Sequence, residues 1–98
     1  MDGTFQQYVR HSARYLTKIP DTLALDQAAS ILCAGVTIYR GLKEAHLQPG
    51  NWVVIPGSGG GLGHLGVQYA HNAGLRVIGI DTGDEKKKMS LELGCEVL

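Results

Sequence analysis

The residues best suited to chemistry lie in a short glycine-rich stretch, residues 57–63, which reads GSGGGLG. A glycine loop between a strand and a helix can hold a pyrophosphate, because the helix N-terminus offers free N–H donors and absent side chains allow close approach. The stretch follows an apolar run and precedes an amphipathic segment, which is the context that such a loop needs. We therefore expect the phosphates to lie against Gly57, Gly60, Gly61, Leu62 and Gly63.

An acidic residue, Asp81, stands 24 residues after Gly57, at the end of the next predicted strand. A carboxylate at this place in a dinucleotide site accepts both hydroxyls of the adenosine ribose. The pattern indicates such a site, and Asp81 should favour NAD over NADP because a 2′-phosphate would meet its negative charge. A methyltransferase, with a similar loop and acid, and a purely structural glycine turn are the alternatives. No Lys-Ser/Thr pair follows the glycines, which excludes the phosphate loop of NTPases.

Strands and helices are predicted to alternate around this loop, at residues 52–55, 62–73, 75–80, 82–93 and 95–98. The strands are short apolar runs, as expected when both faces of a parallel sheet are buried. Helical spacing of apolar residues ends at Gly74, and Thr82 and Glu85 have the spacing of a capping box for the second helix. The order predicts an α/β fold, a partial Rossmann fold formed by the β-α-β-α-β opening of a doubly wound parallel sheet.

The first half of the chain has weaker signals. Thr4–Val9 indicates a short strand, with aromatic and apolar residues among polar ones. Asp26 is the predicted N-cap of a helix over 26–33. A second helix, over 36–45, is expected to follow Gly35. A short strand and linking helices should therefore precede the sheet.

Cys33 lies among apolar residues of the first predicted helix, where a lone cysteine is most often a small core residue. The four histidines lack the spacing of metal ligands and are expected at the surface. Lys86 begins a run of three lysines, which indicates a solvated helix face. Composition and spacing alone therefore predict no metal site.

Length and charge limit the classes of protein further. Ninety-eight residues allow one domain at most. Nine basic and nine acidic residues cancel, so neither nucleic acid nor an anionic membrane is an expected partner. The two cysteines form no secreted framework, and no apolar run approaches the ~20 residues of a membrane span. A cytoplasmic location is the expectation.

Several separated motifs occur together in one order: GTFQQY at 3–8, ILCAGVTIY at 31–39, the glycine loop, and GVQYA at 66–70. With these motifs the chain resembles the medium-chain, zinc-dependent alcohol dehydrogenases over essentially its whole length. The likeness is greatest to the tetrameric type of fungi and bacteria. It implies an enzyme that oxidises a primary or secondary alcohol to an aldehyde or ketone, with NAD as hydride acceptor.

The resemblance also assigns roles to single residues. Cys33 matches a ligand of the catalytic zinc, and Thr37 matches a residue beside the nicotinamide. Asp81 matches the ribose acid, and Lys86 a basic residue that also meets the ribose. Residues 1–45 correspond to the exit of the GroES-like catalytic domain and linking helices, and 46–98 to the N-terminal half of the NAD-binding Rossmann domain.

Parts of the family pattern lie outside this sequence. The other two ligands of the catalytic zinc, the structural zinc site and the proton relay all precede Met1 in the family. We therefore expect the chain alone to be inactive and self-associating, whereas the whole enzyme would be a homotetramer. A zinc-free quinone or enoyl reductase of the same superfamily, and a non-catalytic nucleotide-binding fragment, are the other candidates.

Overall fold

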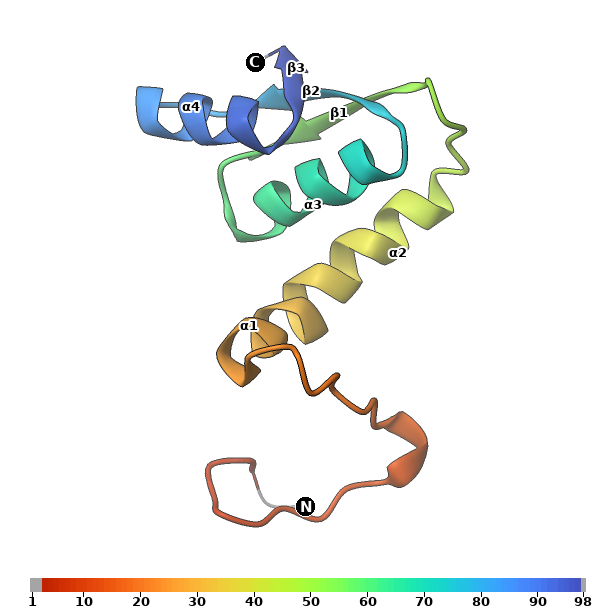
Figure 1. Cartoon of the computed structure of the whole chain (residues 1–98), viewed down its shortest axis with the longest axis vertical. Coiled ribbons are helices and arrows are strands. Elements are labelled where there is room, and N and C mark those ends of the chain that lie inside the picture. The colour runs from red at the N-terminus through yellow and green to blue at the C-terminus, as the bar shows by residue number, and fades with distance from the viewer. Residues whose placement is uncertain (1–2, 98) are drawn as a thin grey trace.

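The computed structural model describes residues 3–97, which form a small parallel sheet, helices packed against it and a long N-terminal segment (Figure 1). Residues 3–24 run away from the sheet as a mostly irregular chain (Figure 1). In chain order the elements are the 3-10 helix η1 (Ala13–Tyr15), α1 (Leu25–Ser30), the π-helical turn η2 (Ile31–Gly35), α2 (Val36–Glu44), β1 (Trp52–Pro56), α3 (Gly61–Asn72), β2 (Arg76–Ile80), α4 (Asp84–Leu93) and β3 (Cys95–Val97).

The sheet has three parallel strands in the order β1-β2-β3. Trp52 pairs with Arg76 and Pro56 pairs with Ile80, so β1 and β2 end together. The glycine loop and Asp81, which directly follow these strands, therefore emerge at the same edge of the sheet. The predicted α/β fold, the β-α-β-α-β opening of a parallel sheet, is confirmed.

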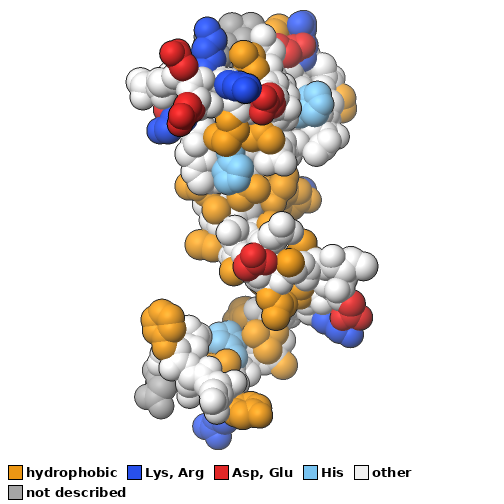
Figure 2. Space-filling view, turned by 60° about the vertical axis from the view of Figure 1, so that its left-hand side comes forward, with side chains coloured by type: hydrophobic (Ala, Val, Ile, Leu, Met, Phe, Trp, Pro, Cys, Tyr) orange, Lys and Arg blue, Asp and Glu red, His pale blue; other side chains and the backbone are white. Residues whose placement is uncertain are grey.

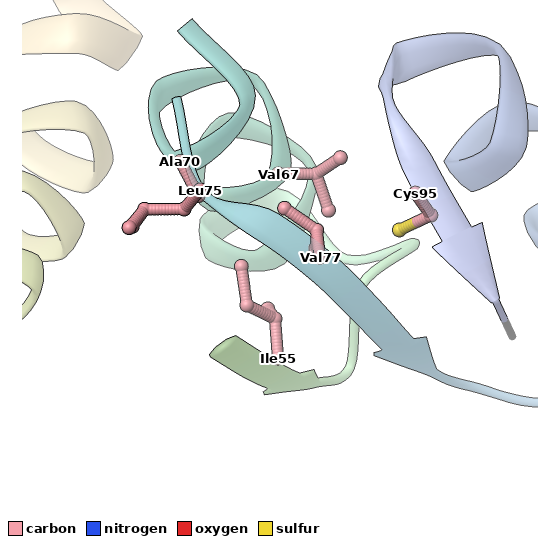
Figure 3. Packing of buried hydrophobic residues seen from close by; sticks show 6 residues of the cluster. All are labelled: Ile55, Val67, Ala70, Leu75, Val77 and Cys95. Atoms are coloured by element: carbon pink, nitrogen blue, oxygen red, sulfur yellow. The ribbon is translucent and has the colours of Figure 1, made fainter. Parts of the chain in front are cut away.

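A compact apolar core lies between α3 and the sheet (Figure 3). Its buried members come from three strands or their flanks and from one helix: Ile55, Val67, Ala70, Leu75, Val77 and Cys95. Val67 and Val77 are fully buried, and burial of such a side chain contributes about 1.5–3 kcal/mol. Gly66 lets α2 approach α3, because a Cβ there would lie 2.8 Å from the side chain of Ile38. Gly66 thus permits close packing of α2 on α3, because it has no side chain.

The opposite face of the sheet is uncovered, which corrects the expectation of strands buried on both faces. Helices α3 and α4 contact each other, and the alternation of side chains along a strand places Val77 on the face toward α3. On the other face, Trp52, Val54 and Ile80 are 44%, 51% and 54% exposed. Among residues 3–97, no helix covers these apolar side chains.

The predicted strand over Thr4–Val9 is wrong. Residues 3–12 form bends and irregular structure, and the side chains of Phe5 and Tyr8 are exposed. A strand needs a neighbour to hydrogen-bond with, and no other strand of the described residues lies beside this segment. Its apolar residues therefore have no partner strand and do not pack into the core.

The helix expected over 36–45 matches α2, but no interruption separates it from the preceding helical residues. Helical structure runs from Leu25 to Glu44 through the π-helical turn, and Gly35 keeps a helical φ of −62°. Gly35 is buried because α3 passes close to it: a Cβ there would lie 2.6 Å from the Tyr69 hydroxyl oxygen. The glycine thus serves packing between helices, and it interrupts nothing.

Both predicted helix caps are corrected as well. Ala24 is the N-cap of α1, and the Asp26 carboxylate accepts the N–H of the next residue, Gln27, within the first turn of the helix. Helix α4 begins after Gly83, which has a φ of +92°, so Thr82 lies outside the helix and caps nothing. Short polar side chains also hydrogen-bond to their own turns, so a cap pattern alone cannot fix the first residue of a helix. The last predicted strand residue, Leu98, lies outside the described residues.

Candidate cofactor-binding site

The glycine loop is closed by backbone hydrogen bonds between the ends of β1 and β2. Gly57 has a φ of +68°, which turns the chain sharply after β1. The N–H groups of Gly57 and Ser58 donate to the Ile80 carbonyl at 2.6 and 3.3 Å, and the N–H of Gly60 donates to the Gly57 carbonyl at 2.9 Å. The loop is therefore held against the end of β2 before any ligand binds.

Two glycines allow the close approaches that this loop needs. A Cβ on Gly63 would clash with the carbonyl oxygen of Gly57 and lie 2.8 Å from the Cα of Ser58, so α3 begins directly against the loop. A Cβ on Gly61 would meet nothing within 4 Å, and no side chain caps the N-terminus of α3. The first N–H groups of this helix, at Gly61 and Leu62, have no acceptor within the helix and no side-chain cap, as an anion site requires.

Asp81 is joined to this loop through both oxygens of its carboxylate. Oδ2 accepts the N–H of Gly59 at 2.8 Å, and Oδ1 accepts the N–H of Thr82 at 2.8 Å. The Lys86 Nζ lies 3.6 Å from Oδ1, and the Asp81 side chain is 12% exposed. The N–H groups of Thr82 and Gly59, followed by the charge of Lys86, hold the pKa of Asp81 below its usual value. The carboxylate is thus negative at neutral pH.

Lys86 lies over the loop as well as beside Asp81. A Cβ on Gly59 would lie 2.6 Å from the Cβ of Lys86, so the stem of this lysine covers Gly59. Figure 2 shows charged side chains gathered at the end of the molecule that carries α4. The sequence predicted a fully solvated run of lysines, whereas the Lys86 side chain is half-exposed and packs on the loop. The structure brings together three predicted parts of the site: the glycine loop, Asp81 and Lys86.

One pair of residues in this region was missed by the sequence reasoning. The side chains of Ser58 and Ser90 are buried, and their Oγ atoms lie 2.9 Å apart. Ser58 belongs to the glycine loop and Ser90 to α4, so the pair joins two elements that flank the site. A serine at the second place of a glycine loop was the available signal, but its partner 32 residues away could not be foreseen.

Cys33 and Thr37 lie on the helical run that packs against α3. The Cys33 side chain is exposed and forms no disulfide, and its carbonyl accepts the Thr37 hydroxyl at 2.7 Å. No group of three or more His, Cys, Asp or Glu that could hold a metal occurs among residues 3–97. A catalytic zinc needs three protein ligands. The described residues therefore offer one candidate thiolate and do not form a zinc site by themselves.

Two surface hollows among the described residues lie apart from the glycine loop. One, of about 730 Å³, lies between α2 and α3 and is lined by Tyr39, Leu42 and Tyr69 among others. A shallower one, of about 220 Å³, shares both tyrosines. In the described part of the chain, no helix has the length and apolar character to cross a bilayer.

Comparison with known proteins decides the family. No protein-family model matches the chain. The chain is 53% identical over 97 residues to an alcohol dehydrogenase of Schizosaccharomyces pombe, and 48% identical over 98 residues to an alcohol dehydrogenase of Geobacillus stearothermophilus. These matches cover 99% and 100% of the chain. The chain belongs to the medium-chain alcohol dehydrogenase family. It spans only 28% and 29% of the length of those two alcohol dehydrogenases.

Solved structures of medium-chain oxidoreductases share the fold. Acetophenone reductase from Geotrichum candidum, in complex with NAD, matches with a TM-score of 0.81 at 29% identity, over 87% of this chain and 25% of that one. Quinone oxidoreductase from Thermus thermophilus, solved alone and with NADPH, matches with a TM-score of 0.75 at 35% identity, over 81% and 27%. The sheet of this chain is therefore the opening part of a Rossmann-type domain from the alcohol dehydrogenase superfamily.

Proposed function

We propose that this chain binds NAD and forms part of an alcohol dehydrogenase, which oxidises a primary or secondary alcohol to an aldehyde or ketone by hydride transfer to the nicotinamide. One observation carries the proposal: a negative carboxylate, Asp81, is tied to a glycine loop beside an uncapped helix N-terminus. The family adds support, because its members include proteins named alcohol dehydrogenase. One solved relative is a complex with NAD.

In this proposal, each part of the loop meets one part of the cofactor. The N–H groups of Gly61 and Leu62 and the positive end of the α3 dipole bind the pyrophosphate. Gly57, Gly60 and Gly63 shape the backbone so that the phosphates come close. The Asp81 carboxylate accepts the ribose hydroxyls, and Lys86 donates to the same sugar.

The position of Asp81 favours NAD over NADP. A 2′-phosphate would lie against a carboxylate that is already held in place by two N–H donors. Juxtaposed like charges at a binding site cost on the order of several kcal/mol. Lys86 offsets only part of this repulsion, because its amine already serves Asp81 at 3.6 Å.

The preference for NAD can be tested with an isosteric substitution in the full-length protein. Asp81→Asn removes the negative charge but keeps an oxygen for the N–H of Gly59. We expect the dissociation constant for NADP divided by that for NAD, measured by calorimetry, to fall by at least about tenfold. Asp84→Asn, which removes an exposed acid at the start of α4, should leave the ratio unchanged. An unchanged ratio in Asp81→Asn would remove Asp81 from the ribose site.

We propose two further roles from the family resemblance. Thr37 would lie beside the nicotinamide, and Cys33 would be one ligand of a zinc ion whose other ligands are not among residues 3–97. The exposure of Cys33 supports this role, since a ligand must be reachable. We also place the boundary between catalytic-domain exit and NAD-binding domain near residue 45, where α2 ends.

The expectation that this chain alone does not hold zinc has a direct test. The 98-residue chain alone should retain no stoichiometric zinc after dialysis, because a single thiolate seldom holds the metal. Elemental analysis of the chain and of Cys33→Ser measures this. Stoichiometric zinc in the unaltered chain, lost in Cys33→Ser, would show that the described residues bind zinc without further ligands.

A quinone reductase is the second candidate function. It is favoured by the match to the Thermus thermophilus quinone oxidoreductase, whose structure was solved with NADPH. The two functions differ in the cofactor and in the substrate. Oxidation of ethanol or propan-2-ol with NAD by the full-length protein supports the dehydrogenase, whereas reduction of a quinone with NADPH alone would support the reductase. Assembly as a homotetramer stays a prediction from the resemblance.

A further inference from the structure

A buried pair of hydroxyl groups links the glycine loop to α4. Ser58 and Ser90 are the buried polar residues among those described, and each has 0% of its surface exposed. Their Oγ atoms are 2.9 Å apart, so one hydroxyl donates a hydrogen bond to the other. Burial of a hydroxyl without a partner destabilises the folded state, so removal of one serine alone leaves the other hydroxyl at a disadvantage.

The pair lies beside the parts of the site that would bind the ribose. Ser90 follows Lys86 by one helical turn, so both side chains lie on the same face of α4. Lys86 packs on Gly59, the residue directly after Ser58. Two contacts one turn apart therefore hold α4 against the loop. An apolar contact alone would let the helix slide, whereas a hydrogen bond prefers one distance and direction.

We propose that the Ser58–Ser90 pair is a positioning device for recognition of the adenosine ribose. This inference rests on the proposed binding of NAD. The pair fixes the place of α4 along the loop, and thereby the place of the Lys86 amine, 3.6 Å from the Asp81 carboxylate. Neither serine side chain is exposed to a ligand. Their effect on binding therefore passes through Lys86 and Gly59.

A comparison of a single serine variant with the double variant distinguishes an effect on ligand binding from an effect on stability. In the full-length protein, Ser90→Ala leaves the Ser58 hydroxyl buried and without its partner, which should lower the melting temperature. The double variant Ser58→Ala/Ser90→Ala has no orphaned hydroxyl, so its melting temperature should return close to that of the unaltered protein. Affinity for NAD and for ADP-ribose should fall about three- to tenfold in both variants, because neither has the hydrogen bond.

Steady-state kinetics give a second measure. The KM for NAD should rise in both variants while kcat stays the same, because the pair acts on cofactor binding and not on the hydride step. Ser30→Ala, an exposed serine on α1, is the matched control and should change neither binding nor melting temperature. If ADP-ribose affinity recovers together with stability in the double variant, the pair is structural only and the proposal is wrong. Failure of the unaltered protein to bind NAD would instead refute the proposed function.

Discussion

Replacement of Gly63 by alanine tests whether the contact between α3 and the loop makes the site. A Cβ at this position would lie 2.6 Å from the carbonyl carbon of Gly57 and closer still to its oxygen. Ordinary van der Waals contact begins near 3.4 Å, so α3 and the loop would have to separate by about 0.8 Å or more. The alanine Cβ is attached directly to the backbone and meets backbone atoms, so no side-chain rotation can relieve the clash.

The expected losses of stability and of NAD affinity follow from this displacement. Overpacking of a close contact costs about 1–3 kcal/mol, which is a large share of the ~5–15 kcal/mol that stabilises a typical domain. A displacement of about 1 Å at a binding site can cost on the order of a hundredfold in function. We therefore expect Gly63→Ala to lose about 1–3 kcal/mol in the free energy of unfolding and to bind NAD about a hundredfold more weakly. Denaturant unfolding and calorimetric titration measure these two effects.

Gly41→Ala is the matched control for this experiment. Gly41 lies inside α2, and a Cβ there would meet nothing within 4 Å. Alanine is preferred to glycine in a helix by roughly 0.5–1 kcal/mol, so this variant should be slightly more stable and bind NAD normally. If Gly63→Ala melts and binds like Gly41→Ala, then α3 is not in contact with the loop as described.

Three further predictions concern charge, surface and thiols. The pKa of Asp81 is lowered in the folded state, so its contribution to stability is present above about pH 3.9 and is lost as pH falls through the lower folded value. Asp81→Asn should therefore flatten the decrease of melting temperature below about pH 4. The 98-residue chain alone should self-associate at micromolar concentration through the uncovered sheet face. Val54→Lys should shift it toward monomer in analytical ultracentrifugation, and a sharp monomer peak for the unaltered chain would refute this. Iodoacetamide at pH 8 should label exposed Cys33 and spare buried Cys95, whose thiol pKa is raised by burial; equal labelling rates in the folded chain would contradict this.

The Rossmann part of the fold could be predicted from the sequence because its signals are local. The apolar run that begins at Trp52 and the helical spacing that ends at Gly74 gave strands and helices close to those observed. Glycine spacing and Asp81 identified the two sides of the candidate site. The structure adds that these sides touch, through the bond from the Gly59 N–H to Asp81.

The errors arose where a long-range partner decides the local structure. Thr4–Val9 has strand-like residues but no neighbouring strand among the described residues. Gly35 was expected only to precede a helix, whereas in the structure it makes room for Tyr69, which comes 34 residues later. The Ser58–Ser90 pair is of the same kind, because neither serine has a signal without the other. Burial on both faces was inferred from strand composition, which cannot show what lies on the far side of Val54.

The hydrogen bond between the Gly59 N–H and Asp81 has a consequence for engineering of cofactor preference. A substitution that admits a 2′-phosphate by removing the carboxylate also releases the loop, because Gly59 loses its acceptor. Asp81→Ala would therefore remove the repulsion of a 2′-phosphate but also loosen the loop. We expect it to weaken the binding of both NAD and NADP. A useful exchange has to keep an oxygen near Gly59 while removing the charge, as asparagine or serine would do. In the proposed NAD site, Asp81 therefore serves both cofactor selectivity and loop rigidity. A substitution changes the first without the second only if it keeps an acceptor for the Gly59 N–H.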